Sequence, residues 1–468
     1  MDHFVHEKTL RGFYENIRGD LKYASLLIFC VLISTLFRHF VSPSIRIKVD
    51  GLIGLAINLY VSGWTTLYSL TIVVAYLILY RLSINTTQLS QISFFGTFGY
   101  LGFLRIIHWF GLPRLEFITN AIQLIMTLRV IGLTYEIADS RSNTAQSLKK
   151  IQEPTTFEAF NYLYSYTGIF TGPYFTYRTY HDAYLADFNV RNGDLFLMIR
   201  PKISTLAWSL PVLLLMNVLA PLKILQEEES ENYHPLTLFV LSALAFIYLR
   251  MRIYSAWMVA ESICIISGIG IYPKNQESET GNGPKRELEE GERVSEYDTR
   301  TIDNLDIPSV ENSDGFRSGM RAWNRSVQFW LASYVYKRSP KSIRMPYTMF
   351  ISAFWHGVHP GYFMSFLTIP LCTTAEDIVF KLFPVDSEGK RNYMFDKIWR
   401  FIRMRGFEMM SCGFLLLTWT DTYRLWKNTY FWLHFFCATV ILLNLAGLLK
   451  RPKKQDKEVI ENAKPHKE

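Results

Sequence analysis

The sequence is poor in charge and in cysteine for its length. Of its 468 residues 19% are charged, against about a quarter in soluble domains, and 49% are hydrophobic. The five cysteines show no CxxC spacing and lie mostly in apolar stretches, so no disulfide framework and no cysteine-based metal site is predicted. Residues 1–22 lack an apolar core followed by a cleavage site, so we expect the first span itself to direct insertion.

The apolar residues gather in blocks whose length, about 20 residues, suits a membrane-spanning helix. We predict an all-α, polytopic membrane bundle of about 9–11 transmembrane helices. Block 52–80 is too long for one straight span. Block 236–271 is interrupted by Arg250 and Arg252, so it is either two spans or one long helix. The approximate spans are 23–41, 52–80, 92–110, 117–138, 157–175, 203–222, 236–271, 345–371, 408–424 and 429–449.

Two polar regions complete this organisation. Residues 273–318 are rich in Glu, Gly, Ser and Asn, which predicts a flexible loop inserted in a membrane domain covering 1–450. Residues 451–468 form a basic tail, which the positive-inside tendency places in the cytoplasm. The net charge of +8 lies largely in short loops and this tail, so it does not indicate nucleic-acid binding. No internal repeat of the kind seen in inverted-repeat transporters is found.

The stretch "AFWHGVHPGYF" (353–363) interrupts an apolar block with histidine, glycine and proline. Proline removes a backbone donor, and carbonyl groups freed in this way cannot face lipid. We therefore expect residues 356–361 to line an internal, partly hydrated chamber and His356 to be a candidate reacting group. His356 and His359 are spaced to share a metal ion, but no third ligand is near in the sequence, so no metal site is predicted.

The stretch "RAWNRSVQFWLASYVYKR" (321–338) predicts an amphipathic, aromatic-rich helix at the membrane interface. Asn324 and Gln328 are four residues apart, on one face of such a helix. Lys337 and Arg338 close the segment and are candidates either for binding phosphate groups or for simple interfacial anchoring. Together the two stretches offer one neutral amide donor and one histidine. They contain no serine–histidine–acid set of the kind used in nucleophilic catalysis.

These two stretches resemble the signature of the membrane-bound O-acyltransferases, in which an Asn after a Trp precedes, by about 30 residues, a His before a Gly. The segments "TNAIQLIMTLRVIGLTYEIAD" (119–139) and "FNYLYSYTGIFTGPYFTYRTY" (160–180) are similar to upstream blocks of that family, and the similarity covers roughly 90–450. Within the family, "HGVHPGYFMSFLTIPL" looks most similar to the lysophosphatidylinositol acyltransferases.

The resemblance implies a helix bundle around an internal tunnel in the endoplasmic reticulum membrane. It implies transfer of a polyunsaturated acyl chain, such as arachidonoyl, from acyl-CoA to the free sn-2 hydroxyl of lysophosphatidylinositol, giving phosphatidylinositol and CoA without a resident cofactor. Asn324 and His356 carry over as the catalytic pair. His359, Gln328, Lys337 and Arg338 are weaker, substrate-binding candidates.

The residues themselves allow this chemistry. A thioester is already activated, so a hydroxyl can attack it directly while a neutral histidine takes the proton. Burial lowers the pKa of a histidine and keeps the ring neutral. Asn324 can donate a hydrogen bond to the developing oxyanion or orient the hydroxyl. The alternatives are a covalent acyl-enzyme through Cys372, another lysophospholipid headgroup or a protein as acceptor, and a non-enzymatic multi-span transporter.

Overall fold

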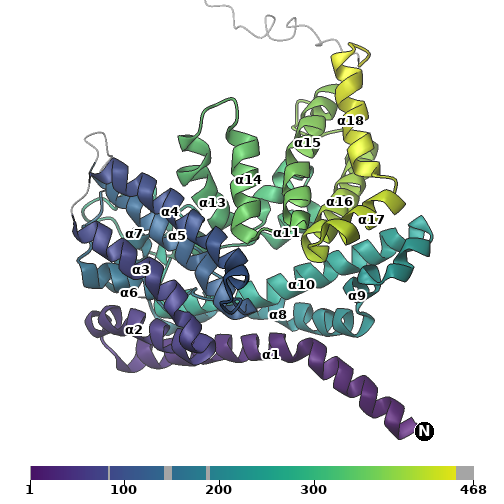
Figure 1. The fold of residues 1–468 in the computed structure, drawn as a ribbon. Coiled ribbons are helices and arrows are strands. Elements are labelled where there is room, and N and C mark those ends of the chain that lie inside the picture. Colours follow the sequence, from purple (N-terminus) through teal and green to yellow (C-terminus); the bar gives the residue numbers. More distant parts are fainter. Residues whose placement is uncertain (1, 83–84, 142–149, 186–189, 450–468) are drawn as a thin grey trace, which may run out of the picture.

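The computed structural model describes residues 2–82, 85–141, 150–185 and 190–449, and they form a helical molecule (Figure 1). The all-α fold is confirmed, because the only sheet among these residues is a two-stranded pair, β1 (Tyr272–Pro273) with β2 (Tyr297–Asp298). The first helices are α1 (Asp2–Phe40), α2 (Pro43–Ser62), α3 (Thr66–Arg81), α4 (Thr86–Ile106), α5 (Phe117–Ser140), α6 (Thr156–Tyr164), α7 (Tyr177–Leu185), α8 (Asn192–Leu219), α9 (Pro221–Gln226) and α10 (Pro235–Ser267). They are followed by α11 (Ile307–Asn312), α12 (Phe316–Ala322), α13 (Arg325–Tyr334), α14 (Arg344–His356), α15 (Pro360–Leu382), α16 (Tyr393–Leu416), α17 (Trp419–Asn428) and α18 (Trp432–Leu445).

Six helical stretches among the described residues are long and apolar enough to cross a membrane, or seven if the bent pair α17 and α18 counts as one span. This makes the chain a multi-pass membrane protein. The number is smaller than that of the predicted spans because 92–110 and 157–175 give no such stretch, and 408–424 and 429–449 together give at most the bent pair. Block 157–175, for example, holds only the short α6, and 345–371 is split between α14 and α15.

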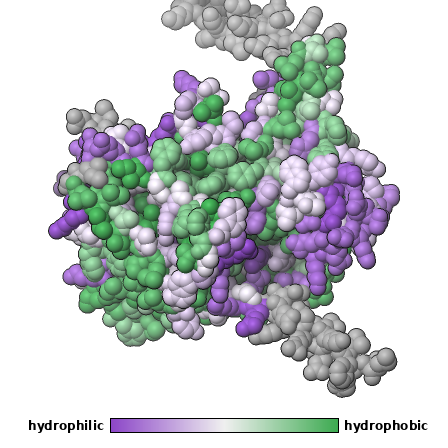
Figure 2. All heavy atoms as spheres, in the orientation of Figure 1, coloured by the Kyte–Doolittle hydropathy of each residue, from purple (hydrophilic) through white to green (hydrophobic). Residues whose placement is uncertain are grey.

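The outer surface of the bundle is suited to hydrocarbon. Figure 2 shows hydrophobic residues over α2 and α3 and over α18, while hydrophilic residues gather near α9 and α17. Leu59 of α2, Leu67 of α3 and Leu442 of α18 are each more than half exposed. Apolar surface of this extent is rare on soluble monomers, and a lipid environment explains it.

Block 236–271 forms one continuous helix, α10, and not two spans. Its two arginines do not interrupt it because each has an acidic partner. Arg252 pairs with Asp20 at 2.6 Å, and Arg250 pairs with Glu311. Paired charges avoid most of the cost that isolated ions meet away from water.

Residues 273–318 differ from the predicted flexible loop, because the segment is folded and partly buried. Ile302, Val310 and Phe316 are 0%, 6% and 1% exposed. Helices from elsewhere in the chain secure its short helices. Arg403 of α16 donates to the carbonyls of Val310 and Glu311, at 2.9 and 2.7 Å, near the end of α11. Composition suggested a solvated loop, but widely spaced apolar residues and these bonds hold the segment against the bundle. The predicted tail, 451–468, lies outside the described residues.

Helix α5 forms the buried centre of the N-terminal half and supports the irregular segment between α6 and α7. Arg129 of α5, 1% exposed, donates to the carbonyls of Tyr162, Leu163, Ser165 and Thr167. Those carbonyls lie at and beyond the end of α6, where the regular helical bonds stop. Glu136, two turns further along α5, accepts from the backbone N–H groups of Tyr177 and Arg178 at the start of α7, at 2.7 and 3.2 Å.

We predict that Arg129→Met strongly destabilises the fold, by about 3 kcal/mol or more, because several buried carbonyls lose their donor together. Thermal unfolding of the detergent-purified protein measures the effect. Arg141→Met is the matched control. It removes an exposed ion pair with Glu153 at 2.6 Å, so a change within about 1 kcal/mol is expected. Equal unfolding temperatures for the two variants would contradict the role given to Arg129.

Candidate active site

His356 is the last residue of α14, at the break between α14 and α15. The chain leaves the helix at Gly357, and Pro360 opens α15 at its first position, where the missing N–H costs nothing. Gly361 lets α15 approach α16 closely. Its N–H donates to the carbonyl of Leu417 at 2.8 Å, and a Cβ there would lie 2.2 Å from the carbonyl oxygen of Gly413. The unusual composition of 353–363 therefore builds a fixed break directly after His356.

The imidazole of His356 lies among aromatic rings. Its centroid is 4.7 Å from that of Trp355, 5.1 Å from Phe366, with which it stacks, and 5.0 Å from Phe414. The side chain is half-buried, and no hydrogen bond joins its nitrogens to another described residue. A charged ring would be poorly solvated here, so the neutral form is favoured. A neutral, unpaired imidazole can accept a proton.

The backbone at His356 is held by Arg105 of α4. One terminal nitrogen of Arg105 donates to the carbonyls of Trp355 and His356, at 3.3 and 3.2 Å, and the other donates to Asn120. A cation at the carbonyl end of a helix satisfies groups that have no helical partner and opposes the negative end of the helix dipole. Arg105 therefore fixes the direction in which α14 ends.

Asn324 lies at a second break, between α12 and α13. Its backbone is in the left-handed region, with φ 48° and ψ 50°, a conformation that asparagine adopts more readily than most residues. This corrects the predicted continuous helix over 321–338, since Trp323 and Asn324 are not helical and α13 begins at Arg325. The sequence of 321–338 does not reveal this turn, because the turn is held by backbone hydrogen bonds to residues 304 and 306, outside the segment.

The side chain of Asn324 is unpaired. Its Oδ1 is buried and has no hydrogen-bond partner among the described residues. Buried polar groups in native proteins are nearly always hydrogen-bonded, so an unpaired one needs an explanation. A group kept available for a substrate is one such explanation.

Two tryptophans attach the helices that carry these residues to the same surface of α5. Trp330 of α13 donates to the carbonyl of Leu128 at 3.0 Å, and Trp355 of α14 donates to that of Leu124 at 3.1 Å. The two carbonyls are one helical turn, about 6 Å, apart along α5. Figure 1 shows α13 and α14 side by side above α5. The structure thus attaches both predicted catalytic segments to the same face of α5.

The weaker candidates have their own contacts. Gln328 donates from Nε2 to the carbonyls of Met320 and Trp323, so its amide closes the end of α12. Arg338 pairs with Asp139 at 2.7 Å and lies over the ring of Tyr135, an arrangement typical of anchoring. Lys337 is exposed, and His359 is exposed next to the break, directly before α15. Their roles in substrate binding stay predictions.

Cys372 lies in a different environment from His356. It is 1% exposed in the apolar cluster of α15, α16 and α18, and its Sγ is 4.0 Å from that of Cys437. Twelve residues separate it from Pro360, which places it about 18 Å along α15 from the break. A thiol enclosed in this way is poorly placed to exchange acyl groups with a lipid and a base at the break.

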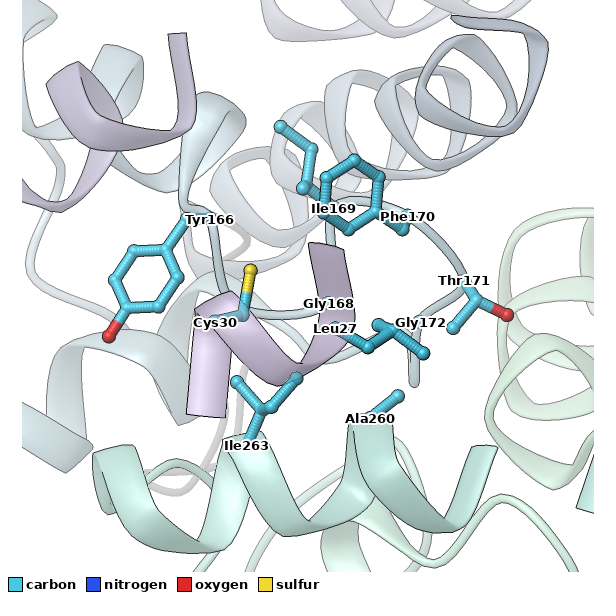
Figure 3. Close-up of a pocket in the computed structure, with 10 residues that line it drawn as sticks. All are labelled: Leu27, Cys30, Tyr166, Gly168, Ile169, Phe170, Thr171, Gly172, Ala260 and Ile263. Atoms are coloured by element: carbon cyan, nitrogen blue, oxygen red, sulfur yellow. The ribbon is translucent and has the colours of Figure 1, made fainter. Parts of the chain in front are cut away.

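A small cavity lies between α1, the segment 166–172 and α10 (Figure 3). Leu27 and Cys30 of α1 and Ala260 and Ile263 of α10 are among the residues that line it. Its free volume of about 10 Å³ is at the limit for one water molecule, so it cannot hold an acyl chain. The predicted tunnel stays a prediction.

Sequence reasoning missed the residues that hold the site. Arg105 carries a recognisable signal, because a lone cation inside the apolar block "GFLRIIHWF" calls for a buried partner. Asn304, whose carbonyl accepts from the N–H of Arg325 at 2.9 Å, carries none, since it lies in the segment that composition assigns to a polar loop.

Unpaired polar groups at helix breaks inside a membrane bundle define a class, that of intramembrane enzymes and transport proteins. Comparison with known proteins decides between the two. Residues 51–417 match the model of the membrane-bound O-acyltransferase family, so the chain belongs to this family and is an O-acyltransferase. The transporter alternative is thereby removed.

Three relatives show how far the similarity extends. The membrane-bound acylglycerophosphatidylinositol O-acyltransferase mboa-7 of Caenorhabditis elegans is 40% identical over 461 residues, covering 95% of this chain and 99% of the relative. The proteins of the same description from Danio rerio (mboat7) and Homo sapiens (MBOAT7) are each 34% identical, covering 93% and 91% of this chain and 96% and 93% of theirs. The family resemblance seen in the sequence is confirmed.

We predict that Arg105→Met lowers O-acyl transfer about tenfold, because α14 then ends without its cation and His356 loses its fixed orientation. Initial rates and unfolding temperatures of purified variants measure the effect. Arg81→Met is the control, since Arg81 ends α3 on an exposed surface and should leave the rate within twofold. Equal rates for the two variants would contradict this role for Arg105.

Proposed function

We propose that the chain is an acyl-CoA-dependent lysophosphatidylinositol acyltransferase of the endoplasmic reticulum membrane. It transfers a polyunsaturated acyl chain, such as arachidonoyl, to the free sn-2 hydroxyl and uses no resident cofactor. The observation that carries the reaction is the pair of unpaired groups, the imidazole of His356 and the carboxamide of Asn324, on helices attached to one face of α5. The acceptor is supported by the printed names of the relatives.

In this mechanism His356 is the general base. A neutral ring nitrogen takes the proton of the acceptor hydroxyl as its oxygen attacks the thioester carbonyl, a role worth roughly 10²–10⁴ in rate. The new ester C–O bond forms, the C–S bond breaks, and the proton passes to the leaving CoA sulfur. Aromatic rings around His356 keep bulk water from competing as acceptor.

Asn324 acts on the charge that develops during attack. Its amide NH₂ donates to the thioester oxygen as this becomes an oxyanion, a contribution of roughly 10²–10³ in rate. The alternative role, orientation of the acceptor hydroxyl, uses the buried Oδ1 as an acceptor. Both roles require a carboxamide that is not already hydrogen-bonded within the protein, which is the state the described residues give it.

The test is a matrix of lysophospholipid acceptors against acyl-CoA donors, with purified protein and product mass as the readout. We expect lysophosphatidylinositol with arachidonoyl-CoA to give the highest rate. His356→Ala and Asn324→Ala should each lose at least about 10²-fold while inserting normally. His39→Ala and Asn192→Ala, exposed and outside the site, are the matched controls.

The outcomes separate the parts of the proposal. Near-normal transfer by His356→Ala would overturn the mechanism. A higher rate with another headgroup or with a protein acceptor would overturn the acceptor, while leaving the mechanism in place. Accumulation of a tagged chain outside the endoplasmic reticulum would overturn the location.

We predict that Cys372→Ser keeps transfer within about twofold, because the hydroxyl attacks the thioester directly and no acyl-enzyme forms. Cys437→Ser, at the contacting cysteine, controls for disturbance of the packing. Rapid-quench analysis with labelled acyl-CoA should find no protein-bound acyl group. A labelled protein band that disappears in Cys372→Ser would establish the covalent route instead.

A further inference from the structure

The carboxamide of Asn324 is free although it lies where asparagine normally caps a helix. Asn324 directly precedes α13, and an asparagine there usually accepts a hydrogen bond from the second or third helical N–H. No such bond is formed by its side chain. Something else must satisfy the start of α13.

Asn304 supplies that cap from another segment. Its Oδ1 accepts from the backbone N–H of Ser326, the second residue of α13, at 3.2 Å, and from the Ser326 hydroxyl at 2.6 Å. Its own carbonyl accepts from the N–H of Arg325 at 2.9 Å. Asn304 is 1% exposed, so these bonds are shielded from water.

Asn304 is in turn held by a buried ionic group. Its N–H donates to Oε1 of Glu261 at 2.8 Å, and Glu261, fully buried on α10, pairs with Lys202 of α8. Lys202 also binds Asp303 at 2.9 Å. The N–H of Asp306 donates to the carbonyl of Ala322 at 3.0 Å. This second backbone bond joins the segment that contains Asn304 to the residues that precede Asn324.

We propose that Asn304 is a positioning residue that caps α13 in place of Asn324 and so keeps the Asn324 carboxamide free for the reacting groups. This inference rests on the catalytic role proposed for Asn324. Without Asn304, the Asn324 side chain can turn back and accept from the N–H of Ser326, as an ordinary cap would. In the self-capped form the Oδ1 is occupied and the NH₂ is turned away from the reacting groups, so the share of protein that can react falls.

The test measures kcat and KM for Asn304→Ala, Asn324→Ala and the double variant. We expect Asn304→Ala to lower kcat about five- to tenfold, with KM for acyl-CoA within twofold, because a cap of ordinary strength shifts the population of Asn324 by that factor. In the Asn324→Ala background the same change should alter the residual rate less than twofold, since Asn304 acts only through Asn324.

Two further variants sharpen the test. Asn304→Asp keeps an acceptor of the same shape at the positive end of a helix and should restore kcat to within about twofold of the original. Asp306→Ala is the matched control. Asp306 caps the neighbouring helix α11 through Ser309, so its loss disturbs the same segment without touching α13.

Each result decides between the two proposals. Full activity of Asn324→Ala would overturn the proposed function of Asn324 and this inference with it. Loss in Asn324→Ala with an unchanged Asn304→Ala would overturn only the inference, as would equal losses from Asn304→Ala and Asp306→Ala. If Asn304→Ala does not fold, Asn304→Leu, which fills a similar volume but accepts no hydrogen bond, replaces it. Failure of both to fold beside a folded Asp306→Ala would make Asn304 a structural residue and overturn the proposal.

Discussion

Inside a membrane every backbone polar group needs a partner, and this chain breaks its helices and satisfies several of these breaks with side chains from other parts of the chain. The signs of the capping groups follow the helix dipoles. Arg129, Arg105 and Arg403 each donate at the carbonyl end of a helix. Glu136 and Glu376 each accept at an amide end, Glu376 from residues 316 and 317 of α12. Hydrogen bonds from charged side chains to the backbone of other helices therefore stabilise the bundle in addition to apolar packing.

The same constraint explains why the proposed reaction centre lies at breaks. A continuous helix uses its own backbone and presents side chains at a fixed pitch, whereas a break lets a residue such as His356 end a helix with its ring free. The groups that make the break stable are then separate from those that we propose to react. Arg105 holds the end of α14, and Asn304 holds the start of α13, so the imidazole and the carboxamide of Asn324 need not serve the fold.

The sequence predicts those features that depend on neighbouring residues. The apolar blocks predict an all-α membrane protein, and Gly357 and Pro360 predict the break after His356. The folded state of 273–318 and the turn at Asn324 could not be predicted in this way. They depend on Glu261 and Arg403, which lie many residues away and become neighbours only in the folded bundle. The caps are single side chains without a periodic pattern, so composition and spacing do not reveal them.

The position of Arg403 along the chain bears on biosynthesis. Arg129 is made shortly before the helix end that it serves, at residues 162–167, so this part of the N-terminal half can close early in synthesis. The carbonyls at the end of α11 must wait for a donor about 90 residues further on. The segment that precedes Asn324 can therefore reach its folded contacts only after α16 has been made.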